Sequence, residues 1–151
     1  MEIKKDDLTG KEIIGLLQRH AIEMETNSPP GSCHYLDLDG LRAPEITFWS
    51  IRDGDRLAGC GALKELDERH GEIKSMHVHS DFRGKGIGDI MLKFVLGVAQ
   101  ERGYRRLSLE TGAMDAFLPA RRLYEKHGFS TCSSFGDYGD DPNSLFMTRV
   151  L

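Results

Sequence analysis

The first third of the chain carries one helical repeat of apolar residues and then a polar stretch. Apolar residues recur three and four positions apart over residues 13–21, which predicts an amphipathic helix. Thr9 and Glu12 fit a capping box, so the helix is expected to begin near Thr9. Residues 27–44 are predicted to be a loop, with a short helical piece at His34–Leu36.

The middle of the chain reads as three consecutive strands. They are rich in β-branched and apolar residues and span residues 46–51, 56–66 and 72–78. Asp53-Gly54 is a strong hairpin signal, and residues 67–71 provide the second turn. Because both turns are tight, we expect an antiparallel meander.

The last third returns to helical spacing and then alternates. Apolar positions from Ile87 to Val98 lie on one helical face, and Gly103 ends that helix. Asp115 is expected to cap a second helix with Pro119 in its first turn. The remaining predicted strands span residues 106–111, 129–135 and 145–150. The pattern indicates the α+β class: a mixed sheet with helices packed on it.

Composition changes this picture little. The chain has 151 residues, 39% of them hydrophobic, and no internal linker or repeat, so a single domain over residues 1–151 is expected. A net charge of −4 argues against a broad basic face for nucleic acid. No signal peptide or membrane-spanning apolar run is evident. Cys33, Cys60 and Cys132 form no disulfide pattern, which favours a cytoplasmic protein.

The most informative stretch lies between a predicted strand and the helix that starts at Ile87. It reads Arg83-Gly84-Lys85-Gly86-Ile87-Gly88. Glycines allow positive φ and close backbone approach, and a helix N-terminus offers free N–H groups. Together with two basic residues, these features form a cradle for a pyrophosphate. Two nucleotide-binding motifs are disfavoured. A Walker A loop would need Ser or Thr after the lysine, where this chain has Gly86. A Rossmann turn would need G-x-G-x-x-G after a parallel strand, whereas the spacing here is G-x-G-x-G and the preceding strands are predicted to be antiparallel.

This stretch resembles the R/Q-x-x-G-x-G/A signature of the GNAT N-acetyltransferase superfamily. Residues 72–78 resemble the family's fourth strand, and residues 123–129 resemble its L-Y-E-K-x-G-F segment. The resemblance covers residues 46–151. It implies a GNAT-like fold, with a mixed, mostly antiparallel sheet of about six to seven strands flanked by about four helices.

The resemblance also implies an acetyl-CoA site. The pantetheine arm would pair with the backbone of Met76, His77 and Val78, and the pyrophosphate would lie on the N–H groups of residues 83–88. Tyr124 matches the tyrosine that commonly protonates the departing thiolate. Phe117 stands where many members carry an asparagine, so no side-chain contact to coenzyme A is expected from it.

Direct attack of an amine on a thioester needs a proton acceptor and a donor for the oxyanion. Glu72 is our first candidate for the proton acceptor and Glu110 the second, since both lie on strands that would flank the cleft; water is the third possibility. The backbone N–H of His77 could serve the oxyanion.

Two other chemistries compete with acyl transfer. His77 and His79 could share a metal, but His34 and His70 supply no convincing third ligand, so no metal site is expected. A cysteine nucleophile is disfavoured because Cys60 lies in an apolar strand.

The acceptor is predicted to be a small primary amine or an amino-acid-like molecule. Two loops that would border it are acidic, which favours a cation, whereas Arg42 could bind a carboxylate. The acidic residues are Asp37, Asp39, Asp137, Asp140 and Asp141. Exposed strand edges allow a homodimer. The alternative function is a catalytically silent GNAT-fold acetyl-CoA sensor or protein-binding module.

Overall fold

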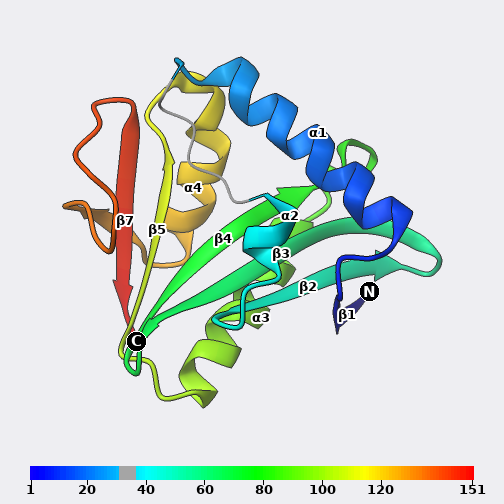
Figure 1. Ribbon diagram of the computed structural model, residues 1–151, viewed down its shortest axis with the longest axis horizontal. Coiled ribbons are helices and arrows are strands. Elements are labelled where there is room, and N and C mark those ends of the chain that lie inside the picture. The colour runs from blue at the N-terminus through cyan, green and yellow to red at the C-terminus, as the bar shows by residue number, and fades with distance from the viewer. Residues whose placement is uncertain (31–36) are drawn as a thin grey trace.

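The computed structural model describes residues 1–30 and 37–151, and it is built on one seven-stranded sheet (Figure 1). The strands lie in the order β1-β2-β3-β4-β5-β7-β6. Among the strands in the described residues, β4 and β5 alone pair in parallel; the other neighbours are antiparallel. The predicted mixed, mostly antiparallel sheet is confirmed. The strands are β1 (Glu2–Lys5), β2 (Ile46–Asp53), β3 (Arg56–Asp67), β4 (His70–Val78), β5 (Arg106–Gly112), β6 (Ser130–Cys132) and β7 (Ser144–Val150).

Helices cover both faces of the sheet (Figure 1). One face packs against α1 (Lys11–Asn27) and α2 (Leu38–Leu41) through a cluster that includes Leu16 and Phe48. The other packs against α3 (Ile87–Glu101) and α4 (Leu118–Lys126) through the larger cluster. We call these the α1 face and the α3 face. Short 3-10 helices span Ser80–Phe82 and Asp115–Phe117.

The meander of β2, β3 and β4 is confirmed, as is the long apolar face of α3. Leu92 and Val95 on this helix are fully buried, and Leu107 and Leu109 of β5 pack in the same cluster. Cys60 is a buried core residue of β3, as its apolar surroundings predicted. Apolar periodicity therefore predicted the central elements correctly.

Helix α1 begins near Thr9, as predicted, but the predicted capping by Thr9 and Glu12 is wrong. Gly10, not Thr9, is the N-cap residue, and no side chain caps the helix. The Thr9 hydroxyl donates to Asp7 Oδ1 at 2.6 Å, and Glu12 accepts from Arg52 across the surface. The capping box does not form because a nearer carboxylate binds the threonine.

Other boundaries also differ. Asp115 begins a 3-10 turn and does not cap α4, whose N-cap is Phe117; Pro119 does lie in the first turn. The strand predicted over 129–135 shortens to β6. Strand β1 was not predicted, because it is a four-residue edge strand with only Ile3 half-buried. The helical piece predicted at 34–36 lies outside the described residues, and α2 follows it, capped by Asp37.

Candidate active site

The central strands β4 and β5 separate part of the way along the sheet, as Figure 1 shows. Their ladder pairs residues 70–72 with 106–108, and the described residues form no further β4–β5 pair. Residues 73–78 and 109–112 therefore border a gap in the sheet. A cavity of about 540 Å³ occupies this gap, with lining residues from α1, β4, β5, α4 and the turn before α3.

A bulge in β4 lies beside the gap. Cys60 pairs with His77 and Ala62 with Lys74, so two residues of β4 stand opposite one residue of β3. Ser75, inside the bulge, has φ 53°. Directly paired residues share a face, and Cys60 and Ala62 both belong to the α1-face cluster. Because of the bulge, both Lys74 and His77 lie on the α1 face.

The turn before α3 combines two glycines of positive φ with N–H groups that are not bonded within the helix. Gly84 and Gly86 have φ of 75° and 79°, a conformation that side chains rarely adopt. The first N–H bonded within the helix is that of Ile90, which donates to the Gly86 carbonyl. The preceding N–H groups at the N-terminus of α3 are thus free to bind an anion. Lys85 Nζ lies 5.5 Å from the centre of the Phe82 ring.

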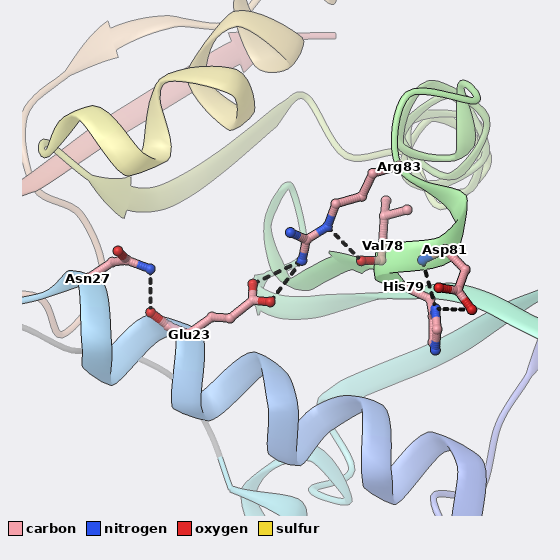
Figure 2. Close-up of polar contacts among 6 residues, drawn as sticks. All are labelled: Glu23, Asn27, Val78, His79, Asp81 and Arg83. Atoms are coloured by element: carbon pink, nitrogen blue, oxygen red, sulfur yellow. Dashed lines mark hydrogen bonds and ion pairs between the residues drawn. The ribbon is translucent and has the colours of Figure 1, made fainter.

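Arg83 connects this turn to α1 (Figure 2). One guanidinium nitrogen lies 2.9 and 3.0 Å from the two carboxylate oxygens of Glu23, and Nε donates to the Val78 carbonyl at 3.4 Å. The side chains are 50% and 47% exposed. A half-exposed ion pair therefore joins α1 to the turn before α3 at the edge of the cavity.

Two imidazoles meet on the α1 face of the cavity. The rings of His20 and His77 are 4.5 Å apart between centres. Burial, the neighbouring imidazole and Arg83 lower the pKa of His77 to about 3, and burial also lowers the pKa of His20. Both side chains are therefore neutral near pH 7.

The structure gives no support for a metal bound by His77 and His79. His79 Nδ1 accepts the N–H of Asp81 at 3.1 Å (Figure 2), so its ring is committed to the turn. Across residues 1–30 and 37–151, no group of three or more His, Cys, Asp or Glu residues is placed to hold a metal ion. His34 and Cys33 lie outside the described residues.

Glu72 is buried on β4 in close contact with two polar groups. Its Oε2 accepts from Lys74 Nζ at 3.1 Å and from the Tyr138 hydroxyl at 2.6 Å. Lys74 also donates to the Tyr138 hydroxyl at 2.9 Å. Burial and the Glu72 charge raise the pKa of Tyr138 well above its ordinary value. All three residues line the cavity.

Glu110 and Tyr124 reach the cavity from opposite faces of the sheet. Glu110 lies on the α1 face of β5, and Tyr124 comes from α4 on the α3 face. Tyr124 packs its ring on Phe129, with ring centres 5.9 Å apart. Burial, with a smaller contribution from the charge of Glu110, raises the pKa of Tyr124 well above its ordinary value. The phenol therefore keeps its proton well into the alkaline range.

The structure thus brings the predicted site residues other than Lys85 around one cavity, which Met76, His77 and Val78 line with Glu72, Glu110, Tyr124 and most residues of the turn. Phe117 also lines it, and its ring lies against Gly112, where an added Cβ would clash with it. Asp137, Asp140 and Asp141 are not among the lining residues. Arg42 borders a second cavity and donates to the Leu8 carbonyl at 2.8 Å.

The lining residues that sequence reasoning missed include four whose contacts shape the site. Lys74 lies two positions after Glu72, so strand alternation already placed it on the same face. Tyr138 lies in a loop that was expected to border the acceptor, but nothing distinguished it from its neighbours. No local signal pointed to His20 or Glu23, whose partners are 57 and 60 residues away.

The chain resembles known acetyltransferases along nearly its whole length. Residues 13–129 match the model of the acetyltransferase (GNAT) family. The uncharacterised N-acetyltransferase YsnE of Bacillus subtilis is 56% identical over 100% of both chains. YedL of Escherichia coli, also an uncharacterised N-acetyltransferase, is 46% identical over 99% of this chain and 94% of its own. An IAA acetyltransferase of Azospirillum brasilense is 40% identical over 82% of this chain and 80% of its own.

Solved structures share the fold. A Klebsiella pneumoniae protein assigned to the acyl-CoA N-acyltransferases superposes with a TM-score of 0.80 at 28% identity, covering 99% of this chain and 97% of the other. A GNAT acetyltransferase from Elizabethkingia anophelis, solved with acetyl-CoA bound, has a TM-score of 0.73 at 20% identity over 99% and 97% of the two chains. In the described part of this chain, no helix is both long and apolar enough to span a bilayer.

Proposed function

Because this chain belongs to the GNAT acetyltransferase family and is an N-acetyltransferase, we propose that it transfers an acetyl group from acetyl-CoA to the primary amine of a small or amino-acid-like acceptor. The observation that carries this proposal is the gap between β4 and β5, which continues into the anion-binding turn before α3. A slender ligand with a phosphate at one end and a thioester at the other matches this shape.

The residues present fit such a donor. The turn at residues 83–88 offers backbone N–H groups and a helix N-terminus for the diphosphate. The unpaired edge of β4 near Met76 and Val78 offers backbone groups for the pantetheine amides. Acetyl-CoA supplies an acetyl group activated as a thioester. The His77 N–H, the first candidate for the oxyanion, instead faces β3, because His79 donates to the Ala58 carbonyl and His77 pairs with Cys60 in the same register.

Two side chains then share the proton transfers. Glu72 is committed to Lys74 and Tyr138, and protonating it would weaken both contacts. Glu110 therefore becomes the favoured acceptor of the amine proton, directly or through water. Tyr124, protonated and on the opposite side of the gap, donates to the departing thiolate. Acid and base thus reach the gap from different faces.

Thermal unfolding tests the proposal. Acetyl-CoA and CoA, each at about 100 times its Kd, should stabilise the folded chain by about 2.7 kcal/mol, whereas ATP and NAD should not. Thiol release in the presence of a panel of primary amines then measures turnover. No shift with either CoA species would contradict the donor site. A shift without thiol release from any amine would favour the silent acetyl-CoA sensor.

The ion pair between Glu23 and Arg83 leads to a prediction about donor affinity. The Glu23 carboxylate neutralises Arg83 at the edge of the proposed diphosphate site. An exposed ion pair is worth little, and removing its negative charge leaves Arg83 free for a phosphate. Glu23→Gln is therefore expected to tighten CoA binding about twofold to fivefold in calorimetry. Pantetheine, which lacks the diphosphate, should show no change.

Glu12→Gln is the matched control. Glu12 lies on the same helix and forms a comparable exposed pair with Arg52, and neither residue lines the cavity. This variant should leave the Kd for CoA unchanged. Weaker CoA binding by Glu23→Gln would mean that Glu23 holds Arg83 in place for the donor.

A further inference from the structure

Three polar groups form a closed hydrogen-bonded set at the end of the gap where β4 and β5 join. Glu72 and Lys74 come from β4, and Tyr138 comes from the segment between β6 and β7. The three contacts measure 3.1, 2.6 and 2.9 Å. Glu72 directly precedes the point where the ladder to β5 ends. A charged pair is thus fixed in the wall of the cavity on the α1 face.

This pair is nearly removed from water. The side chain of Lys74 is 9% exposed and that of Glu72 is 3% exposed. Burial of an ion pair is costly unless its remaining donors and acceptors are also satisfied. A lysine ammonium has three N–H groups, and Lys74 uses two of them. Both bonds to Glu72 end on Oε2, and among the described residues no other group binds its Oε1.

The unused hydrogen-bond donor of Lys74 and acceptor of Glu72 indicate a ligand. One N–H of Lys74 and one carboxylate oxygen of Glu72 remain on two side chains that both line the cavity. A ligand that carries a negative and a positive group a short distance apart would satisfy both with charge-assisted hydrogen bonds. A simple amine would leave the Lys74 N–H unsatisfied, and a simple carboxylate would leave Glu72 unsatisfied.

We propose that the acceptor is an α-amino acid or a similar compound with an amine and a carboxylate on neighbouring carbons, and that Lys74 binds its carboxylate. This inference rests on the proposed function. Glu72 Oε1 attracts the ammonium, and Glu110, across the gap, accepts its proton before attack. Tyr138 is a positioning residue, because its hydroxyl contacts both charged groups and its ring lies 5.5 Å from Lys74 Nζ.

Matched acceptors test the inference with the unmodified chain and acetyl-CoA. L-leucine, L-leucinamide and isopentylamine share the side chain and the amine, but only L-leucine carries a carboxylate. L-phenylalanine, its amide and phenethylamine form a second set. The kcat/KM for the amino acid is expected to exceed those for its amide and its amine by about tenfold to 100-fold. An equal or lower value for both amino acids overturns the inference.

Substitution of Lys74 tests whether this side chain causes the preference for amino acids over amines. Lys74→Met should reduce the ratio between amino acid and amine to about one, and Lys74→Arg should retain most of it. Lys4→Met, on the exposed strand β1, is the control and should leave the ratio unchanged. If Lys74→Met does not fold because Glu72 is left unpaired, the double variant Glu72→Gln, Lys74→Met removes both charges. A ratio that survives loss of the Lys74 charge overturns its role.

Failure of the inference and failure of the proposed function can be told apart. If the chain acetylates amines without preferring those that carry a carboxylate, the acetyltransferase proposal stands. The inference that the acceptor is an amino acid is then overturned. If no acceptor of either kind is acetylated, the inference is overturned as well. The shift of the unfolding midpoint with acetyl-CoA then shows whether the donor site still holds.

Discussion

Tyr124→Phe is expected to lower kcat by about 100-fold, because a positioned general acid typically contributes that much or more. The Kd for acetyl-CoA should stay the same. The aromatic ring packs on Phe129, and phenylalanine preserves that packing, so only the hydroxyl is lost. Thiol release under saturating substrates measures kcat, and calorimetry measures the Kd.

The pH profile adds an independent check. Burial raises the pKa of Tyr124, so the phenol stays protonated above the range in which an exposed tyrosine ionises. The wild-type rate should therefore show no alkaline fall from loss of this acid near pH 10, the ordinary value. The control is Tyr104→Phe, which removes another buried hydroxyl, bonded to Glu65 at 2.9 Å and outside the cavity lining. A Tyr124→Phe variant with wild-type kcat at every pH would remove the hydroxyl from the mechanism.

Gly86→Ala is expected to weaken acetyl-CoA binding by about tenfold to 100-fold, which corresponds to the loss of one charge-assisted hydrogen bond. Gly86 has φ 79° and is the N-cap of α3. A Cβ in this region costs about 1–2 kcal/mol, and relaxation of the backbone turns the N–H groups away from the diphosphate. Titration of the folded variant with acetyl-CoA measures the effect.

Gly54→Ala separates the binding effect from backbone strain. Gly54 has φ 60° in the turn between β2 and β3, and at both glycines an added Cβ meets no atom within 4 Å. Both variants should therefore lose similar stability, measured as the denaturation midpoint without ligand. Only Gly86→Ala should lose donor affinity. Equal affinities in the two variants would contradict the role of this turn.

The parts of the fold predicted from sequence are those that rest on periodicity or on a turn with special φ. The apolar face of α3 and the meander of β2 to β4 each repeat over many residues, so a single ambiguous position does not change the assignment. Element ends depend on single contacts. The Thr9 hydroxyl binds Asp7 rather than the start of α1, and only the folded chain shows which partner is nearer.

The candidate site also has features that local sequence predicts and others that it does not. Backbone-based features, such as the turn at residues 83–88, follow from local sequence. Contacts between distant side chains do not: Lys74 and Tyr138 are 64 residues apart, and Arg83 and Glu23 are 60 apart. The bulge at Ser75 also changes which face His77 occupies, and simple alternation cannot predict that change.

The gap between β4 and β5 also bears on aggregation. An unpaired strand edge on the outside of a protein can recruit strands from other molecules. Here two such edges lie within the sheet, and residues of α1 and α4 border them on opposite sides. Side chains of α1 and α4 that line this space of about 540 Å³ stand in the way of a strand from another chain, whose own side chains would project on both faces. The fold therefore leaves unpaired backbone N–H and C=O groups available to a thin ligand. Detachment of α1 would expose the same strand edges to other chains and make them an aggregation site.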